Sequence, residues 1–481
     1  MEKPSKPTNV TFTQAILPIL FLSILIVYGL ILRPLFLNQP AFPLEIIFIL
    51  AAVFAVGQQF MLGYEWEDIQ QTIVNKLARA LPAFFILFAI GVIISSWIVS
   101  GTIPMLVYYG LKIINPSYLY VLAFLVPVVF SSLTGTSWGS AGTIGVVIMG
   151  IAVALNANLG ITAGAIIGGA YFGDKLSPLS DTTNLAALAA DVDLFEHIRS
   201  MMYTTMPSAI LATIIYLALG FVYPPETSAA DLNSIDPFLK SLSSVFNFNI
   251  FLLLPPAIVL YGSLRQKATI PTLLTSVLVA ALLGLIFQKF TITDVVQALY
   301  KGFHIDMAIW VGAVPEQVVT LVNRGGLYAL NESIVIAFMV FIFIGAIDHI
   351  NAMPIVVNRI FRFAKSRASA IISSLFAAAF TNALTSNQYA TSFIVGDAFK
   401  SKYDALRIPR KVLSRSLEDT GTMLESIVPW TTTAVFMVGT LGVPVSEYWH
   451  WQLLSLINFV VAPLLAILGI GCFYDEVDEE S

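Results

Sequence analysis

Two short polar stretches, each set between strongly apolar flanks, repeat one pattern 251 positions apart in this chain. Residues 131–141 read SSLTGTSWGSA and residues 382–392 read NALTSNQYATS. The same offset carries Thr134 onto Thr385 and Pro178 onto Pro429. A repeat that holds over separate motifs predicts an internal two-fold architecture.

The flanks of the two copies differ in positive charge. Residues 359–367 and 400–411, beside the second copy, contain nine Lys and Arg residues, whereas the equivalent windows 108–116 and 149–160 contain only Lys112. Loops rich in Lys and Arg stay on the cytoplasmic side of a membrane. We therefore expect the two copies to insert from opposite sides, which is the inverted-repeat plan of secondary transporters.

Composition independently predicts a membrane protein. The chain is 57% hydrophobic and 11% charged, and its mean hydropathy is +0.85, which exceeds what soluble globular chains tolerate. We predict an all-α polytopic membrane protein with two inverted-topology repeats, broken helices, re-entrant hairpins and about 10–13 transmembrane segments. The clearest spans are expected at 13–32, 43–62, 81–99, 118–133, 205–223, 248–264, 271–288, 332–347, 368–384 and 451–472. Short or interrupted spans are expected at 103–114, 142–156, 161–190, 304–323, 389–399 and 410–441.

The apolar pattern divides the chain into five parts. They are N-terminal peripheral helices (1–64), a first inverted repeat (65–190), linking or scaffold helices (191–290), a second inverted repeat (291–443) and a C-terminal helix with an acidic tail (444–481). Amphipathic stretches at 65–81 and 291–303 are expected to lie along the membrane face, and 224–247 is expected to be a polar loop. Scaffold helices outside the repeats leave room for a homodimer.

Composition also excludes several functional classes. The net charge of −5 comes largely from loop acids and the acidic tail, so no nucleic-acid surface is implied. The single cysteine, Cys472, rules out an intramolecular disulfide and a thiolate metal cluster. The chain has neither a Walker sequence nor a dinucleotide-binding glycine motif, and its four histidines lack ligand spacing. We expect no cofactor.

Two further polar segments, 168–187 and 416–436, are expected to break helices inside the membrane. In the first, Pro178 forbids a continuous helix, so one half-helix should end near Asp174 and another should begin with Ser177 as its cap. Asp174 then lies beside freed carbonyls, and Asp181 lies in the first turn of the second half-helix. Hydroxyl, carbonyl and carboxylate oxygens suit Na⁺ better than a transition metal.

The second broken segment repeats this logic, with Glu418, Asp419 and Glu425 before Pro429 and three threonines after it. Structural explanations stand beside the functional ones. Lys175 could neutralise Asp174, Arg415 could pair with Glu418 or Asp419 across one helical turn, and Asp181 could be a helix-start acid. Serine, threonine and glycine in membrane helices often serve close packing. Asp348 and His349 could form a proton relay or a solvated helix end.

A buried carboxylate that binds either Na⁺ or H⁺ makes the two ions mutually exclusive, and with alternating access this gives antiport. A channel would require repeated rings of lining residues, which the sequence does not contain. Two alternatives remain: a Na⁺- or H⁺-coupled carrier of organic anions on the same scaffold, and a membrane scaffold or assembly factor whose polar breaks are packing sites.

The segments TGTSWGSAGT, GAYFGDKLSPLSDTTNLAA and SRSLEDTGTMLESIVPWTTTAVFMVGTLGV resemble the signature blocks of the NhaC-type sodium/proton antiporters, within the ion-transporter superfamily of inverted-repeat carriers. The resemblance covers about residues 65–443. It implies exchange of cytoplasmic Na⁺ for external H⁺ across a bacterial inner membrane, at a site between the hairpin tips and the broken helices. The site residues that it implies are Thr136, Ser137, Asp174, Ser177, Asp181, Thr182, Asn184, Thr385, Asn387, Glu418 and Asp419. Asn382, which begins the second polar stretch, completes the predicted site, and Asp174 and Asp181 are the first candidates for Na⁺.

One segment departs from the pattern of this family. Many members read close to S-P-L-I-P-W-N after the E-D-x-G-T block, whereas this chain reads ESIVPWT over residues 425–431. The family also includes carriers that exchange malate and lactate with Na⁺ and H⁺. Half-helix N-termini at Ser177 and Thr431 could hold a small carboxylate, so exchange of malate, lactate or an amino acid is the alternative function.

Overall fold

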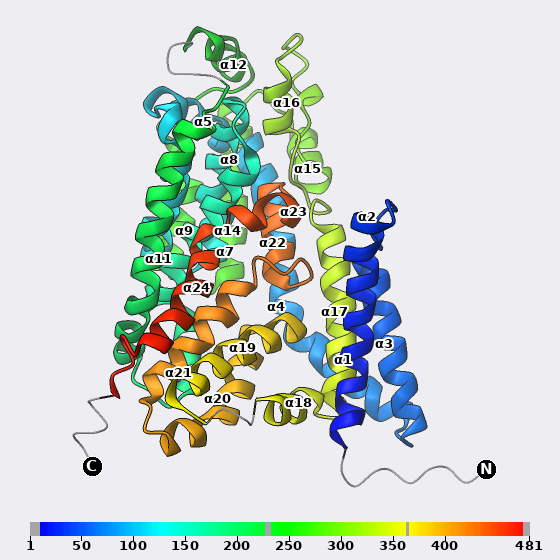
Figure 1. The fold of residues 1–481 in the computed structure, drawn as a ribbon. Helices are drawn as coiled ribbons and strands as arrows, with labels where there is room; N and C mark the ends of the chain where they lie inside the picture. Colours follow the sequence, from blue (N-terminus) through cyan, green and yellow to red (C-terminus); the bar gives the residue numbers. More distant parts are fainter. Residues whose placement is uncertain (1–9, 227–231, 362–364, 475–481) are drawn as a thin grey trace.

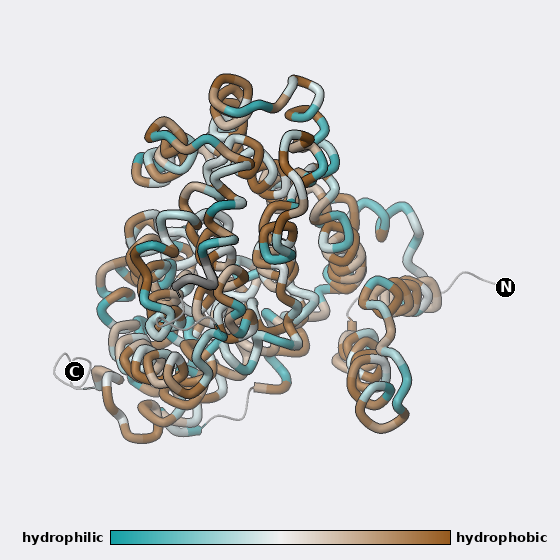
Figure 2. The backbone as a smooth tube through the Cα atoms, turned by 90° about the horizontal axis from the view of Figure 1, so that it is seen from above, coloured by the Kyte–Doolittle hydropathy of each residue, from teal (hydrophilic) through white to brown (hydrophobic). Residues whose placement is uncertain are grey.

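The computed structural model describes residues 10–226, 232–361 and 365–474, and every regular element in these ranges is a helix (Figure 1). Among them, nine helices are long and apolar enough to cross a membrane, and two bent helix pairs also meet this condition. Seen from above, hydrophobic residues follow most of the helices (Figure 2). The prediction of an all-helical polytopic membrane protein is confirmed.

The N-terminal helices form a pair at one edge of the bundle (Figure 1). They comprise α1 (Phe12–Ile26), the π-helical turn η1 (Val27–Leu32), α2 (Arg33–Phe36) and α3 (Leu44–Met61). Helix α1 packs on α3 and α18, and α3 packs on α17 of the second repeat. This pair therefore attaches to the bundle through the second repeat.

The region of the first repeat contains a long helix, a hairpin and a broken helix. Its elements are α4 (Trp66–Val99), α5 (Thr102–Ile113), η2 (Pro116–Tyr118), α6 (Leu119–Thr134), α7 (Ser137–Ser140), η3 (Ala141–Gly145), α8 (Val146–Ala154), α9 (Leu159–Leu176) and α10 (Asp181–Ala189). The stretch 65–81 is not a separate surface helix, because it forms the first half of α4. One side of this stretch is buried, with Ile73 against Gly345 of α17, whereas Trp66, Val74 and Leu81 are exposed.

The linking region contains more helix than expected. It comprises α11 (Leu194–Val222), α12 (Leu232–Val245), η5 (Ile250–Leu253), α13 (Leu254–Leu264) and α14 (Thr269–Phe287). The predicted polar loop 224–247 holds α12, which is amphipathic and precedes a 96° bend into the next helical segment. The prediction of a loop was wrong there because Leu, Ile, Phe and Val recur at helical spacing between its polar residues.

The second repeat region and the C-terminal part complete the chain. They comprise α15 (Ile292–Lys301), η6 (Ile305–Met307), α16 (Glu316–Val322), α17 (Asn331–His349), α18 (Ala352–Ile360), α19 (Arg367–Thr385), α20 (Gln388–Ala405), α21 (Arg410–Ser416), η7 (Leu417–Thr422), α22 (Thr432–Leu441), α23 (Val445–Tyr448), η8 (Trp449–Trp451) and α24 (Leu453–Leu468). The segment 304–323 is not a crossing, because it holds only two short helices joined by loops. The acidic tail, 475–481, lies outside the described residues.

Two helical hairpins approach the middle of the bundle from opposite ends. In Figure 1 the α6–α8 hairpin descends from the upper end, and the α19–α20 hairpin rises from the lower end. Their tips turn in the same way: Gly135 and Ser386, at equivalent positions, both adopt left-handed backbone with φ of 69° and 50°. The next residues, Thr136 and Asn387, both cap the following helix by accepting a hydrogen bond from the N–H three residues on.

Close packing joins the first hairpin to the broken helix α9. A Cβ atom at Gly169 would lie 2.1 Å from the carbonyl oxygen of Phe124, and one at Gly173 would lie 2.0 Å from the hydroxyl of Ser131. Glycine at these two positions allows the backbones of α6 and α9 to approach closely. The hairpin tip is thereby held beside the end of α9, where Asp174 lies.

Candidate functional site

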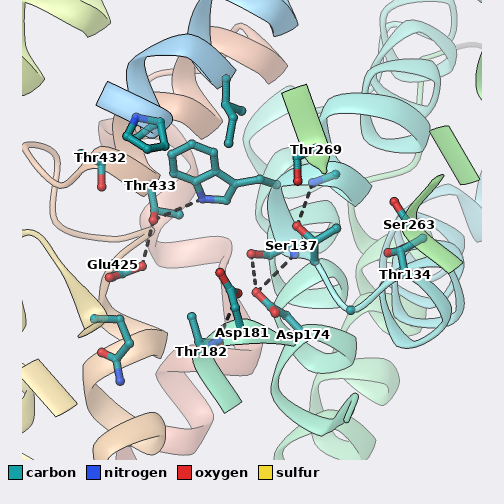
Figure 3. A pocket seen from close by; sticks show the side chains of 18 of the residues that line it. Thr134, Ser137, Asp174, Asp181, Thr182, Ser263, Thr269, Glu425, Thr432 and Thr433 are labelled. Atoms are coloured by element: carbon teal, nitrogen blue, oxygen red, sulfur yellow. Dashed lines mark hydrogen bonds between the residues drawn. The ribbon is translucent and has the colours of Figure 1, made fainter. Parts of the chain in front are cut away.

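A cavity of about 560 Å³ lies where both hairpin tips meet the two broken helices. Figure 3 shows Ser137, Asp174 and Asp181 on one side of this space and Glu425 and Thr433 on the other. The first group comes from the first repeat and the second group from the second repeat. The cavity is therefore formed between the repeats.

Asp174 is buried in the wall of the cavity, with 5% of its surface exposed. One carboxylate oxygen accepts hydrogen bonds from the Ser137 hydroxyl at 2.6 Å and from the Ser137 N–H at 3.2 Å. The other oxygen accepts from the Ser180 hydroxyl at 2.6 Å. No described Lys, Arg or His forms an ion pair with Asp174. Its partners in the described chain are thus electrically neutral.

The break between α9 and α10 brings these donors together. Helix α9 ends at Leu176, close to the expected position, and α10 begins at Asp181. Ser180 caps α10 by accepting from the Thr183 N–H. The prediction that Ser177 is this cap was wrong: the chain makes a turn through Pro178, and the hydroxyl of Ser177 instead donates to the Ser132 carbonyl at 3.1 Å.

Aromatic residues at the hairpin tips link the two repeats across the cavity. Tyr389, on the second hairpin, donates its hydroxyl to Asp181 of the first broken helix. Trp138, at the equivalent position of the first hairpin, donates its indole N–H to Thr433 of the second broken helix at 3.4 Å. Trp138 also stacks on Phe436, with ring centroids 4.3 Å apart. Each tip is therefore bonded to the half-helix of the other repeat.

Glu425 is a cavity residue that was not among the predicted ion ligands. It occupies the position in the second repeat that Asp174 holds in the first, at the same offset of 251. Its carboxylate oxygens accept from the Asn382 amide at 3.0 Å and from the Thr433 hydroxyl at 2.8 Å. The offset of 251 positions would have identified Glu425 if it had been applied to the acidic residues as well as to the prolines and threonines.

The turn between α13 and α14 also contributes to the wall. Gln266, Lys267 and Thr269 line the cavity from this turn, and Arg79 lines it from α4. The linking helices therefore reach the cavity, and their role as a scaffold stays a prediction. Sequence periodicity could not reveal this contribution, because it depends on how α13 and α14 pack against α6 and α4, which are distant in the chain.

Comparison with known proteins identifies the family. The sequence model of the Na⁺/H⁺ antiporter family matches residues 169–470. The chain belongs to this family. Similar proteins include an uncharacterized Na⁺/H⁺ antiporter of Haemophilus influenzae, 40% identical over 461 residues that cover 96% of this chain and 97% of the relative. The Na⁺/H⁺ antiporter NhaC of Alkalihalophilus pseudofirmus is 33% identical over 97% of both chains, and the malate-2H⁺/Na⁺-lactate antiporter of Bacillus subtilis is 32% identical over 95% of this chain and 96% of the relative. The resemblance to NhaC-type antiporters is confirmed.

A cluster of buried charged residues lies behind the cavity wall of this antiporter family member. Lys175 and Asp419 form an ion pair of 2.6 Å, with 0% and 1% of their side chains exposed. Thr204 donates to the same carboxylate at 2.8 Å, and Arg415 lies 3.8 Å from its other oxygen. Lys175 therefore neutralises Asp419 and not its neighbour Asp174. The expectation that Arg415 lies near Asp419 is confirmed.

The predicted site residues of the family member divide into two sets. Those that line the cavity are Thr136, Ser137, Asp174, Asp181, Thr182 and Asn387. Those outside its lining are Ser177, Asn184, Asn382, Thr385, Glu418 and Asp419. Asn382 contacts the cavity residue Glu425, whereas Glu418 accepts from Thr422 at 2.7 Å. Ion binding by any of these residues stays a prediction.

Asp348 lies at the end of α17 and is partly exposed, and its role in a proton relay or a solvated helix end stays a prediction. Its carboxylate pairs with Lys76 of α4 at 2.6 Å. The neighbouring His349 contacts the Thr72 hydroxyl at 3.0 Å, also on α4. These contacts join α17 to the part of α4 that immediately precedes the cavity residue Arg79.

Proposed function

We propose that this chain is a secondary active transporter that exchanges Na⁺ for H⁺ by alternating access, with Asp174 as the group that binds either ion. The supporting observation is a buried carboxylate whose described partners, Ser137 and Ser180, are all neutral donors. A charge at membrane depth costs about 2.5–3.5 kcal/mol on the gentler scale. Asp174 therefore gains stability from a bound cation or a proton.

Competition between the two ions at one carboxylate provides the coupling. A proton on Asp174 removes the charge that attracts Na⁺, and bound Na⁺ favours the deprotonated form. A loaded site is nearly neutral and an empty site is charged, so moving the empty site through the bilayer has the larger desolvation cost. Reorientation of the loaded form then carries Na⁺ one way and H⁺ the other.

Other lining residues have defined positions in this scheme. Asp181 is exposed to the cavity and is held by Tyr389, so it can receive a cation before Asp174 does. Thr136, Thr182 and Asn387 provide further hard oxygen atoms in the same wall. The Lys- and Arg-rich loops assign the lower end in Figure 1 to the cytoplasm. We place the protein in a bacterial inner membrane, where it would export Na⁺.

The test uses the purified full-length chain in liposomes that are acidic inside and contain a pH-sensitive dye. Addition of Na⁺ or Li⁺ should dequench the dye by releasing internal protons. Asp174→Asn should abolish the response, whereas Asp236→Asn, at an exposed position on α12, should keep it. Absence of a response from the wild-type protein would exclude Na⁺/H⁺ exchange.

A second candidate function is the coupled transport of a small organic anion. The observation that favours it is the size and lining of the cavity, which at about 560 Å³ far exceeds one Na⁺ and includes the cationic residues Arg79 and Lys267. A carboxylate of malate, lactate or an amino acid would find positive charge there. In the same liposomes, a response that requires one of these anions would favour this function over simple exchange.

A further inference from the structure

The internal repeat provides a second copy of the carboxylate position that Asp174 occupies. The offset of 251 carries Asp174 onto Glu425 and also carries Ser180 onto Thr431. Ser180 caps α10 and Thr431 caps α22, so the two broken helices match at the level of individual hydrogen bonds. Glu425 therefore occupies the place in the fold that Asp174 occupies in the first repeat, although its carboxylate has different hydrogen-bond partners.

Glu425 lacks a cationic partner in the described chain. It is 8% exposed and lines the cavity, and its carboxylate accepts hydrogen bonds from neutral groups, among them the side chains of Asn382 and Thr433 and the backbone N–H of Gln388. The nearby acid Asp419 shows the contrast, because it holds Lys175 at 2.6 Å. Lys175 thus neutralises the buried carboxylate of Asp419. The negative charge of Glu425 remains available to a cation that enters the cavity.

A buried oxygen atom beside Glu425 has no hydrogen-bond partner among the described residues. It is the amide oxygen of Asn382, a fully buried residue whose amide nitrogen donates to Glu425. Buried polar atoms are normally satisfied, so orphaned oxygens indicate places where a ligand supplies the missing interaction.

We infer that Glu425 forms a second Na⁺ site in the cavity, separate from the site at Asp174. The inference rests on the proposed function and extends it, because one chain would then hold two Na⁺ ions at once. Carboxylate, hydroxyl and amide oxygens are the donors that a hard monovalent cation prefers. Two bound ions also balance the charges of Asp174 and Glu425, the two buried carboxylates that line the cavity among the described residues, which one ion cannot do.

The experiment measures equilibrium binding of ²²Na⁺ to the purified full-length chain in lipid nanodiscs at alkaline pH. The wild-type chain should bind two Na⁺ ions. Glu425→Gln and Asp174→Asn should each lose one of them, whereas Glu425→Asp, which keeps a carboxylate, should retain two with weaker affinity at one site. The control Glu447→Gln, at an exposed position, should bind two.

If the wild-type chain and Glu425→Gln both bind one ion while exchange in liposomes is normal, the inference of a second Na⁺ site is wrong and the proposed function stands. If the wild-type chain binds no Na⁺ and shows no exchange, the proposed function fails with it. Should Glu425→Gln not fold, Thr433→Val replaces it, since it removes a hydroxyl that contacts Glu425. Full binding at both sites in the folded Thr433→Val variant would then overturn the inference.

Discussion

Asp174 and Lys175 are neighbours in the sequence, yet their side chains serve different parts of the molecule. Successive residues in an α-helix point about 100° apart, because 3.6 residues make one turn. Asp174 thus faces the cavity, while Lys175 faces α11 and η7 and pairs with Asp419. The same geometry explains why a buried lysine adjacent to the candidate ion ligand does not neutralise it.

Replacing Lys175 by Met tests the structural role of this buried pair. The variant leaves Asp419 with the more distant Arg415 as its cationic partner among the described residues, so the free energy of unfolding should fall by about 3–5 kcal/mol. Chemical unfolding in detergent micelles measures it. Lys240→Met, on the exposed side of α12, should change little. Equal stability of Lys175→Met and wild type would contradict the role of Lys175 as the partner that Asp419 requires.

Replacing Asp181 by Asn tests the exposed carboxylate of the cavity. The amide preserves the size of the side chain and its contact with Tyr389 but removes the charge. We expect coupled exchange to be abolished while folded protein is recovered in normal yield. Dye dequenching in liposomes and size-exclusion chromatography measure these outcomes. Exchange at the wild-type rate would remove Asp181 from the mechanism.

Among the helices, the contact between α6 and α9 positions the first hairpin tip. Gly173→Ala would push these helices apart, because the new Cβ would meet Ser131 and the backbone of Ser132 at 2.0–2.2 Å. We expect a loss of about 1–3 kcal/mol of stability. We also expect weaker apparent affinity for Na⁺, since Ser137 would separate from Asp174.

Gly168→Ala provides the matched control on the same helix. A Cβ at Gly168 would meet Leu454 at 3.3 Å, a contact that a small shift relieves. The concentration of Na⁺ at half-maximal exchange distinguishes the two variants. An unchanged value in Gly173→Ala would show that the close approach of α6 and α9 does not position the site.

A charged network joins the loop after α10 to helices α20 and α21. Arg410 pairs with Asp404 at 2.8 Å and with Asp191 at 3.0 Å, and Lys400 pairs with Asp191 at 2.9 Å. Lys400 lowers the pKa of Asp191, and Arg410 lowers the pKa of Asp404. Lowered carboxyl pKa values stabilise the fold above the ordinary pKa of Asp, about 3.9, and this stabilisation is lost as the pH falls. The network is therefore insensitive to pH in the physiological range.

The pH dependence of Arg410→Gln tests this conclusion. The variant should lower the midpoint of thermal unfolding by the same amount at pH 6 and at pH 9, because Asp191 and Asp404 are ionised at both values. The difference from wild type should shrink in high salt and below about pH 4. A difference that changes between pH 6 and pH 9 would mean that another titrating group controls these contacts.

For the molecule as a whole, the opposite insertion of the two hairpins makes a direct topological prediction. Asn156 follows α8, Ser401 lies near the end of α20, which is the equivalent helix of the second repeat, and both residues are exposed. In a Cys472→Ala background, cysteines at these positions should be labelled by an impermeant maleimide from opposite sides of the membrane. Labelling of both from one side would contradict the inverted arrangement.

Local patterns in the sequence were sufficient for the helices, their breaks and the hairpin tips. The apolar runs predicted the membrane spans, and Pro178 predicted the break after α9. The internal repeat predicted the positions of both hairpin tips. The presence of Asp174 and Asp181 in one cavity also followed, because a break of a few residues keeps its two ends together. These features depend on the conformational preferences of residues that are close together in the chain, and these preferences can be predicted from the sequence.

The tertiary structure alone decided which polar groups meet across the bundle. It paired Lys175 with Asp419, 244 positions away, and it brought the α13–α14 turn into the cavity wall. It also selected Ser180 over Ser177 as the cap of α10. Side-chain direction and helix packing determine these contacts, and both depend on the mutual fit of segments that are far apart in the chain.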